Sequence, residues 1–148
     1  MVLPLLTRLD HVGIACRDLD RAVTLYQATF GLEVASLEVN EEQGVREAML
    51  RAGASAVSVA GVWPGYIQLL EPLSPDSPVG RFLARRGEGL HHVGYGVSDI
   101  GQALATVAGT GVRLVDERPR HGSMGASIAF LHPADLGGVL TELVQSPS

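Results

Sequence analysis

The chain contains no lysine, so all eleven of its basic residues are arginine. Without a lysine amine the protein cannot use Schiff-base chemistry or a phosphate-loop lysine. Its single cysteine excludes an internal disulfide and a zinc site built from several cysteines. The formal net charge of -5 disfavours non-specific binding to nucleic acid.

Long hydrophobic runs are also absent, although 46% of the residues are apolar. No stretch approaches the roughly 20 apolar residues of a membrane-spanning helix, and the N-terminus lacks the pattern of a signal peptide. We therefore expect a cytoplasmic protein with no membrane partner. A chain of 148 residues suffices for one compact domain, or for two half-domains that share a core.

Two stretches of the chain begin alike, which indicates an internal duplication. Residues 9–13 read Leu-Asp-His-Val-Gly, and residues 90–94 read Leu-His-His-Val-Gly. The same offset of 81 positions places Asp18 on Asp99, and each of these precedes a segment with helical periodicity. A duplicated module with a histidine at the start of each copy suggests one metal site shared by the two halves.

Hydrophobic periodicity predicts the same order of elements in both copies. For the first copy we expect a strand at 9–15, a helix capped by Asp18 and ended by Gly31, and strands at 33–39, 47–52 and 66–71. For the second we expect a strand at 91–97, a helix from Asp99 to about 108, and strands at 113–116, 127–132 and 139–144. We predict one domain over 1–148, with module one at about 7–73, a linker helix at about 74–88 and module two at about 89–146.

Each copy places a histidine in its first strand. His92 shares a strand face with Gly94 and Gly96, which leave room for a ligand, whereas His91 points with the apolar residues of the opposite face. His11 is the counterpart of His92. We therefore choose His11 and His92 as candidate metal ligands, although either histidine taken alone is more often structural.

The last strand of each copy holds one polar residue between apolar ones, Gln68 in the first and Glu142 in the second. A buried carboxylate needs a partner because isolated burial of its charge is costly, and a divalent cation is such a partner. Two imidazoles, one amide oxygen and one carboxylate suit octahedral cobalt, nickel, manganese or iron, and zinc less specifically. Four protein ligands leave two positions open, as in a catalytic site.

Glu47 is a further candidate because the offset of 81 places it on Ile128. A carboxylate where the other copy has an apolar residue is a candidate general base. The alternative is an exposed glutamate near the loop that contains Glu41 and Glu42.

Together these residues resemble the vicinal oxygen chelate superfamily and, within it, the methylmalonyl-CoA epimerases. The resemblance runs from about residue 9 to 145. It rests on Asp10-His11-Val12, the run from Tyr26 to Gly31, Glu42-Gln43-Gly44-Val45-Arg46-Glu47, Gly89-Leu90-His91-His92-Val93, and the run from Gly138 to Leu143.

The resemblance implies an α+β fold of two tandem βαβββ modules, which form a curved mixed sheet around a metal-binding cleft. It implies His11, Gln68, His92 and Glu142 as ligands of one divalent metal ion, for which we expect cobalt before manganese, nickel, iron or zinc. It also implies Glu47 as a catalytic acid/base, with Glu142 as the second.

The predicted reaction is the isomerase step that interconverts (2R)- and (2S)-methylmalonyl-CoA in propionate metabolism. A proton alpha to the thioester is removed through a metal-stabilised enolate and returned to the other face. The expected partners are the acyl-CoA substrate and a second copy of the chain in a homodimer.

Three other functions stay open at this point. A glyoxalase I-type lactoylglutathione lyase also moves a proton with a metal and carboxylates. An extradiol dioxygenase would use two histidines and one glutamate with iron, and needs neither Gln68 nor Glu47. A non-catalytic, ligand-sequestering protein of the same fold would need neither the four candidate ligands nor a base.

Overall fold

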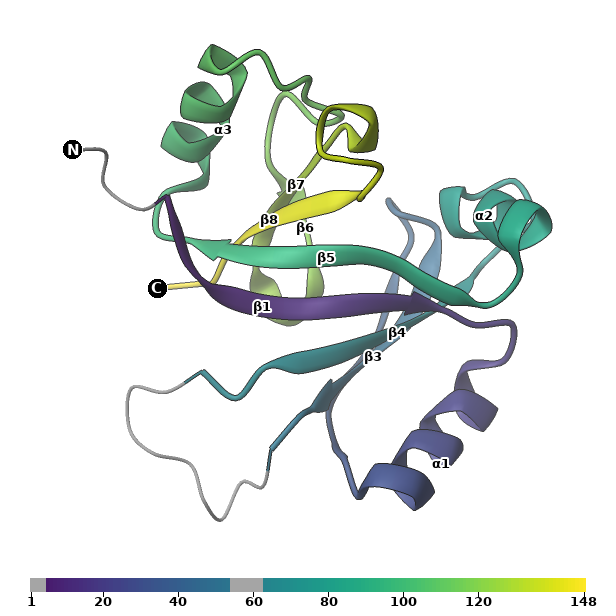
Figure 1. The fold of residues 1–148 in the computed structure, drawn as a ribbon. Helices are drawn as coiled ribbons and strands as arrows, with labels where there is room; N and C mark the ends of the chain where they lie inside the picture. The colour runs from purple at the N-terminus through teal and green to yellow at the C-terminus, as the bar shows by residue number, and fades with distance from the viewer. Residues whose placement is uncertain (1–4, 54–62) are drawn as a thin grey trace. The chain divides into compact units, whose positions relative to one another are not determined.

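A computed structural model describes residues 5–53 and 63–148 of the chain (Figure 1). These residues form two compact units. The first unit is His11–His91, and the second joins the start of the chain up to Asp10 with His92–Ser148. No helix in the described ranges is long and apolar enough to cross a membrane.

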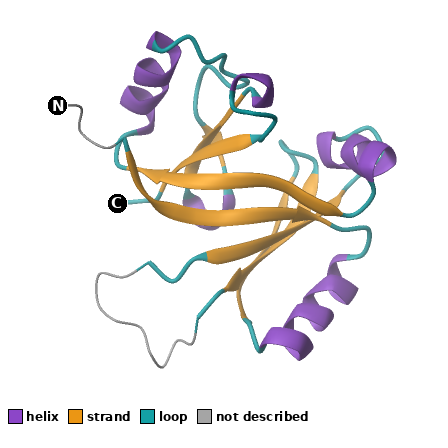
Figure 2. Ribbon diagram, in the orientation of Figure 1, coloured by secondary structure: helices purple, strands orange, loops and turns teal. Residues whose placement is uncertain are grey.

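The first unit contains a mixed sheet with helices on both faces. Its strand order is β2-β3-β4-β1, with β1 parallel to β4 and the other neighbours antiparallel (Figure 2). Its elements are the second half of β1 (Leu6–Ala15), α1 (Leu19–Phe30), β2 (Glu33–Asn40), β3 (Val45–Arg51), β4 (Tyr66–Pro72) and α2 (Pro78–Arg86).

Local capping sets both ends of α1, as predicted. The side chain of Asp18 accepts a hydrogen bond from the Arg21 N–H at 3.0 Å, which satisfies one of the donors left open at a helix start. Gly31 ends the helix in the left-handed region at φ 69°, and its N–H donates to the Gln27 carbonyl.

The two faces of the first sheet have different coverings. α1 packs against β3 and β4 through Leu19, which joins a buried cluster that includes Leu50 and Leu69. On the opposite face α2 places Val79 and Leu83 against the end of the sheet. Because side chains alternate along a strand, Glu47 of β3 and Gln68 of β4 fall on the face opposite α1.

The second unit repeats this arrangement. Its strand order is β5-β8-β7-β6, with β5 parallel to β8 and the other neighbours antiparallel. It contains β5 (Gly89–Val97), of which the part from His92 belongs here, α3 (Ile100–Gly109), β6 (Arg120–His121), β7 (Ser127–Leu131) and β8 (Thr141–Gln145), with 3-10 turns at Ser123–Gly125 and Pro133–Asp135.

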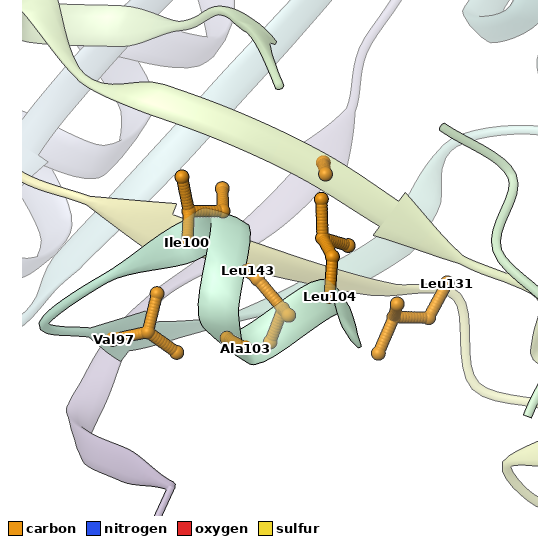
Figure 3. Packing of buried hydrophobic residues seen from close by; sticks show 7 residues of the cluster. Val97, Ile100, Ala103, Leu104, Leu131 and Leu143 are labelled. Atoms are coloured by element: carbon orange, nitrogen blue, oxygen red, sulfur yellow. The ribbon is translucent and has the colours of Figure 1, made fainter. Parts of the chain in front are cut away.

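The core of the second unit lies between α3 and its sheet. Figure 3 shows residues of α3 pointing toward those of β7 and β8. Asp99 caps this helix by accepting from the Gln102 N–H at 3.0 Å, as predicted. The cluster comprises Val97, Ile100, Ala103, Leu104, Ala129, Leu131 and Leu143.

The predicted strand at 113–116 is wrong. This segment pairs with β7 only irregularly, through one isolated bridge between Leu114 and Leu131. The carboxylate of Asp116 accepts the Phe130 N–H at 2.9 Å, so a side chain replaces a backbone partner in the ladder. The regular pairing with β7 is made later, by the two residues of β6.

Two helical glycines provide a matched test of the packing around α2. A Cβ added to Gly80 would lie 2.7 Å from the Pro75 carbonyl oxygen, whereas one added to Gly109 in α3 meets nothing within 4 Å. We predict that Gly80→Ala lowers the free energy of unfolding by about 2 kcal/mol, because backbone must move to make room. Gly109→Ala should leave it unchanged or raise it by up to about 1 kcal/mol. Urea denaturation measures both, and equal effects would contradict the close packing.

Candidate functional site

The first unit brings a histidine and an amide together on one sheet face. Gly13 of β1 is paired with Gln68 of β4 in the parallel ladder. His11 lies two residues before Gly13, so its side chain is on the same face as that of Gln68. We call His11 and Gln68 the first half-site.

The second unit repeats this geometry with a carboxylate. Gly94 of β5 is paired with Glu142 of β8, and His92 lies two residues before Gly94. The His92 Nε2 and Glu142 Oε2 atoms are 3.9 Å apart. We call His92 and Glu142 the second half-site, and its members are the counterparts of His11 and Gln68 in strand order and register.

Glu47 lies beside the first half-site. In the antiparallel ladder of β3 and β4 it is paired with Leu70, while Met49 is paired with Gln68. The Gln68 Nε2 atom donates a hydrogen bond to Glu47 Oε2 at 3.0 Å. The alternative of an exposed glutamate is wrong, because Glu47 is 3% exposed.

The candidate residues fit a divalent metal in their chemistry. All five are buried, with no residue more than 5% exposed: His11, Glu47, Gln68, His92 and Glu142. The Gln68 amide turns its nitrogen to Glu47, so its oxygen is the atom suited to ligate a metal. Two atoms that each lie about 2 Å from a common ion are at most about 4 Å apart, which the 3.9 Å between His92 and Glu142 satisfies.

The adjacent histidines of β5 differ in their surroundings. The His91 ring packs edge-on against Phe82 of α2, with ring centroids 4.9 Å apart. Burial lowers the pKa of His91 from 6.5 to about 4. His91 is therefore a neutral packing residue at neutral pH, and the candidate ligand of this strand is His92.

Phe130 is a contact of the site that the sequence reasoning missed. Phe130 lies on β7 and is paired with Glu142 of β8. Its ring meets the His92 imidazole edge-on, at a centroid distance of 5.3 Å and an interplanar angle of 86°. The duplication could have identified it, because the offset of 81 places Phe130 on Met49, the residue that is paired with Gln68. An aromatic edge against the imidazole restricts the orientation of that ring.

Comparison with known proteins places this arrangement in a family. A family model described as the glyoxalase/bleomycin resistance protein/dioxygenase superfamily matches residues 10–130. Two solved structures of methylmalonyl-CoA epimerases are each 52% identical to the chain with a TM-score of 0.90. One is in complex with methylmalonyl-CoA and NH4+, and covers 97% of this chain and 96% of that one. The other is a Streptomyces coelicolor variant in complex with 2-nitronate-propionyl-CoA, and covers 97% and 99%.

A third relative supports the same placement. The ethylmalonyl-CoA/methylmalonyl-CoA epimerase of Cereibacter sphaeroides is 34% identical over 140 residues, which are 93% of this chain and 97% of that protein. The chain belongs to the methylmalonyl-CoA epimerase family. The predicted α+β fold of paired βαβββ modules, the vicinal oxygen chelate fold, is thereby confirmed.

The lowered pKa of His91 predicts a pH dependence of stability. Above pH 6.5 the imidazole is neutral in both states, but between pH 6.5 and 4 the unfolded chain binds a proton that the folded protein does not. The free energy of unfolding should fall across this window by about 3 kcal/mol from this residue, and His91→Gln should remove that part. Urea denaturation at pH 7 and pH 4.5, with a chelator present, measures it. Parallel pH curves for the two proteins would contradict the assignment.

Proposed function

We propose that this protein interconverts (2R)- and (2S)-methylmalonyl-CoA by removing and returning the proton on the carbon alpha to the thioester. The observation that carries the proposal is the buried carboxylate of Glu47, held by the Gln68 amide beside the first half-site. A buried, oriented carboxylate is suited to proton transfer. The acyl-CoA ligands of the two similar epimerase structures support the choice of substrate class.

We infer that the two half-sites together hold one divalent metal ion, with cobalt as the first candidate. Three of the residues, His11, His92 and Glu142, are buried and of types that ligate metals, and the Gln68 oxygen completes the set. The ion would supply Lewis-acid stabilisation of negative charge on the substrate's oxygens.

In this proposal Glu47 accepts the alpha proton. The electron pair of the broken C–H bond forms a double bond to the thioester carbon, the π pair of the carbonyl moves to its oxygen, and the substrate becomes an enolate. A free carboxylate is too weak a base for this carbon acid near neutral pH. Lewis-acid stabilisation of the enolate oxygen would make up this difference, and a positioned acid or base typically contributes a further factor of about 10² to 10⁴ in rate.

Inversion requires a proton donor on the other face of the enolate. We assign this role to Glu142, which stays both a ligand and a second acid/base in the proposal. Return of the proton from Glu47 regenerates the starting epimer, while delivery from a protonated Glu142 gives the other. Glu47 then loses its proton to solvent and Glu142 takes one up, which restores the starting state. The homodimer, the cytoplasmic location and the role in propionate metabolism remain predictions from the sequence.

Isotope exchange tests the reaction directly. Cobalt-loaded protein incubated with (2R)-methylmalonyl-CoA in deuterated water should place one deuterium on the alpha carbon and yield the (2S) epimer. Mass spectrometry and separation of the epimers measure this, with chelator-stripped protein as the control for spontaneous exchange. If deuterium uptake equals the control while methylglyoxal and glutathione are converted to lactoylglutathione, the lyase alternative replaces the proposal.

A substitution of Glu47 tests the assigned base. Glu47→Gln keeps a side chain of the same shape but removes its basicity, so epimerisation should fall about 10³-fold. Cobalt binding, measured by calorimetry, should persist because Glu47 is not an assigned ligand. Glu41→Gln, at an exposed turn position, is the matched control and should keep full activity. A fully active Glu47→Gln protein would end the assignment of the base.

A further inference from the structure

The two half-sites differ in one correlated pair of positions. In the first unit the amide Gln68 has the carboxylate Glu47 as its neighbour on the adjacent strand. In the second unit the carboxylate Glu142 has Ile128 at the equivalent position, since Phe130 is paired with Glu142 as Met49 is with Gln68. Each unit thus has one carboxylate at these two positions. It is on the strand before the last in the first unit, as Glu47, and on the last strand in the second, as Glu142.

Electrostatics explains why a carboxylate at both positions is unfavourable. The Gln68 Nε2 and Glu47 Oε2 atoms are 3.0 Å apart, and both side chains are buried. A second carboxylate at position 68 would place two like charges at hydrogen-bond distance, with little water to screen them. An amide instead offers an N–H donor to the carboxylate and keeps an oxygen for a metal. Ile128 brings no charge next to Glu142, so a glutamate is tolerated there.

We propose that Gln68 is a positioning residue for Glu47: its Nε2 donor orients the Glu47 carboxylate while its Oε1 atom serves as the metal ligand. The presence of Glu47 is then the reason that the first unit has glutamine where the second has glutamate. The consequence for catalysis rests on the proposed function, in which Glu47 is the base. The coupling between the two side chains does not, because it is measurable in metal-free protein without substrate.

Thermal unfolding of four variants in the presence of a chelator tests the coupling. Gln68→Glu should lower the Tm by about 5 °C, because it replaces the donor by a like charge. The double variant Glu47→Gln/Gln68→Glu exchanges donor and acceptor, so the Tm should return to within about 2 °C of the original. Glu47→Gln alone completes the cycle. Glu41→Gln/Gln68→Glu is the matched control, and its Tm should stay as low as that of Gln68→Glu.

A kinetic measurement separates positioning from a purely structural role. Gln68→Glu keeps an oxygen ligand, so cobalt should still bind and the KM for the acyl-CoA should change less than about twofold. Its kcat should fall about 10-fold or more, because the Glu47 carboxylate loses the donor that orients it. The exchanged double variant should bind cobalt and unfold at a Tm close to the original. It should show no epimerisation, because its carboxylate is on β4 and no longer on β3.

Each outcome decides the inference. Recovery of the Tm in the exchanged variant supports it, including the case in which Gln68→Glu alone fails to fold. The inference is overturned if Gln68→Glu lowers the Tm equally with and without Glu47→Gln. It is also overturned if neither Gln68→Glu nor the exchanged variant folds, or if the kcat of Gln68→Glu is unchanged. If the unsubstituted protein shows no epimerase activity but the Tm values still show the coupling, the proposed function is wrong and the pairing of Gln68 with Glu47 still holds.

Discussion

The register of two parallel strand pairs is the constraint on which the candidate site depends. Pairing of Gly13 with Gln68, and of Gly94 with Glu142, sets which face of each sheet carries a histidine and an oxygen-bearing side chain. Side chains alternate along a strand, so a slip of one residue would point these polar groups into the clusters packed under α1 and α3. Burial of the apolar residues packed under α1 and α3 therefore fixes the two candidate histidines, Gln68 and Glu142 on the opposite faces.

Duplication explains why the two half-sites are alike, and divergence of the two copies explains where they differ. Both copies keep a histidine in the first strand and an oxygen-bearing side chain in the last, with the same pairing partners. The copies differ where the second has Ile128, which lies in an apolar cluster, and the first has Glu47. A reaction that distinguishes two faces of a substrate needs groups that differ, and Glu47 against Ile128 is such a difference.

Local contacts, and the half-site residues that the duplication marks in both copies, could be predicted from the sequence, whereas other features fixed by distant contacts could not. The caps at Asp18 and Asp99 involve residues three positions away, so the sequence alone reveals them. The pairing of β6 depends on its partner strand and on the Asp116 side chain. Hydrophobic periodicity gives no information on either. Whether Glu47 is buried, and what it contacts, likewise depends on the register of β3 against β4.

The residue before each candidate histidine shows that equivalent half-sites are held by different interactions. Asp10 is buried and accepts hydrogen bonds from Arg8, whose guanidinium also donates to Ser146. Its counterpart His91 packs its neutral ring edge-on against Phe82. A charged network ties one strand to the chain's end, and aromatic packing ties the other to α2. Either kind of interaction can hold the neighbouring imidazole in place, because both fix the backbone of the strand that carries it.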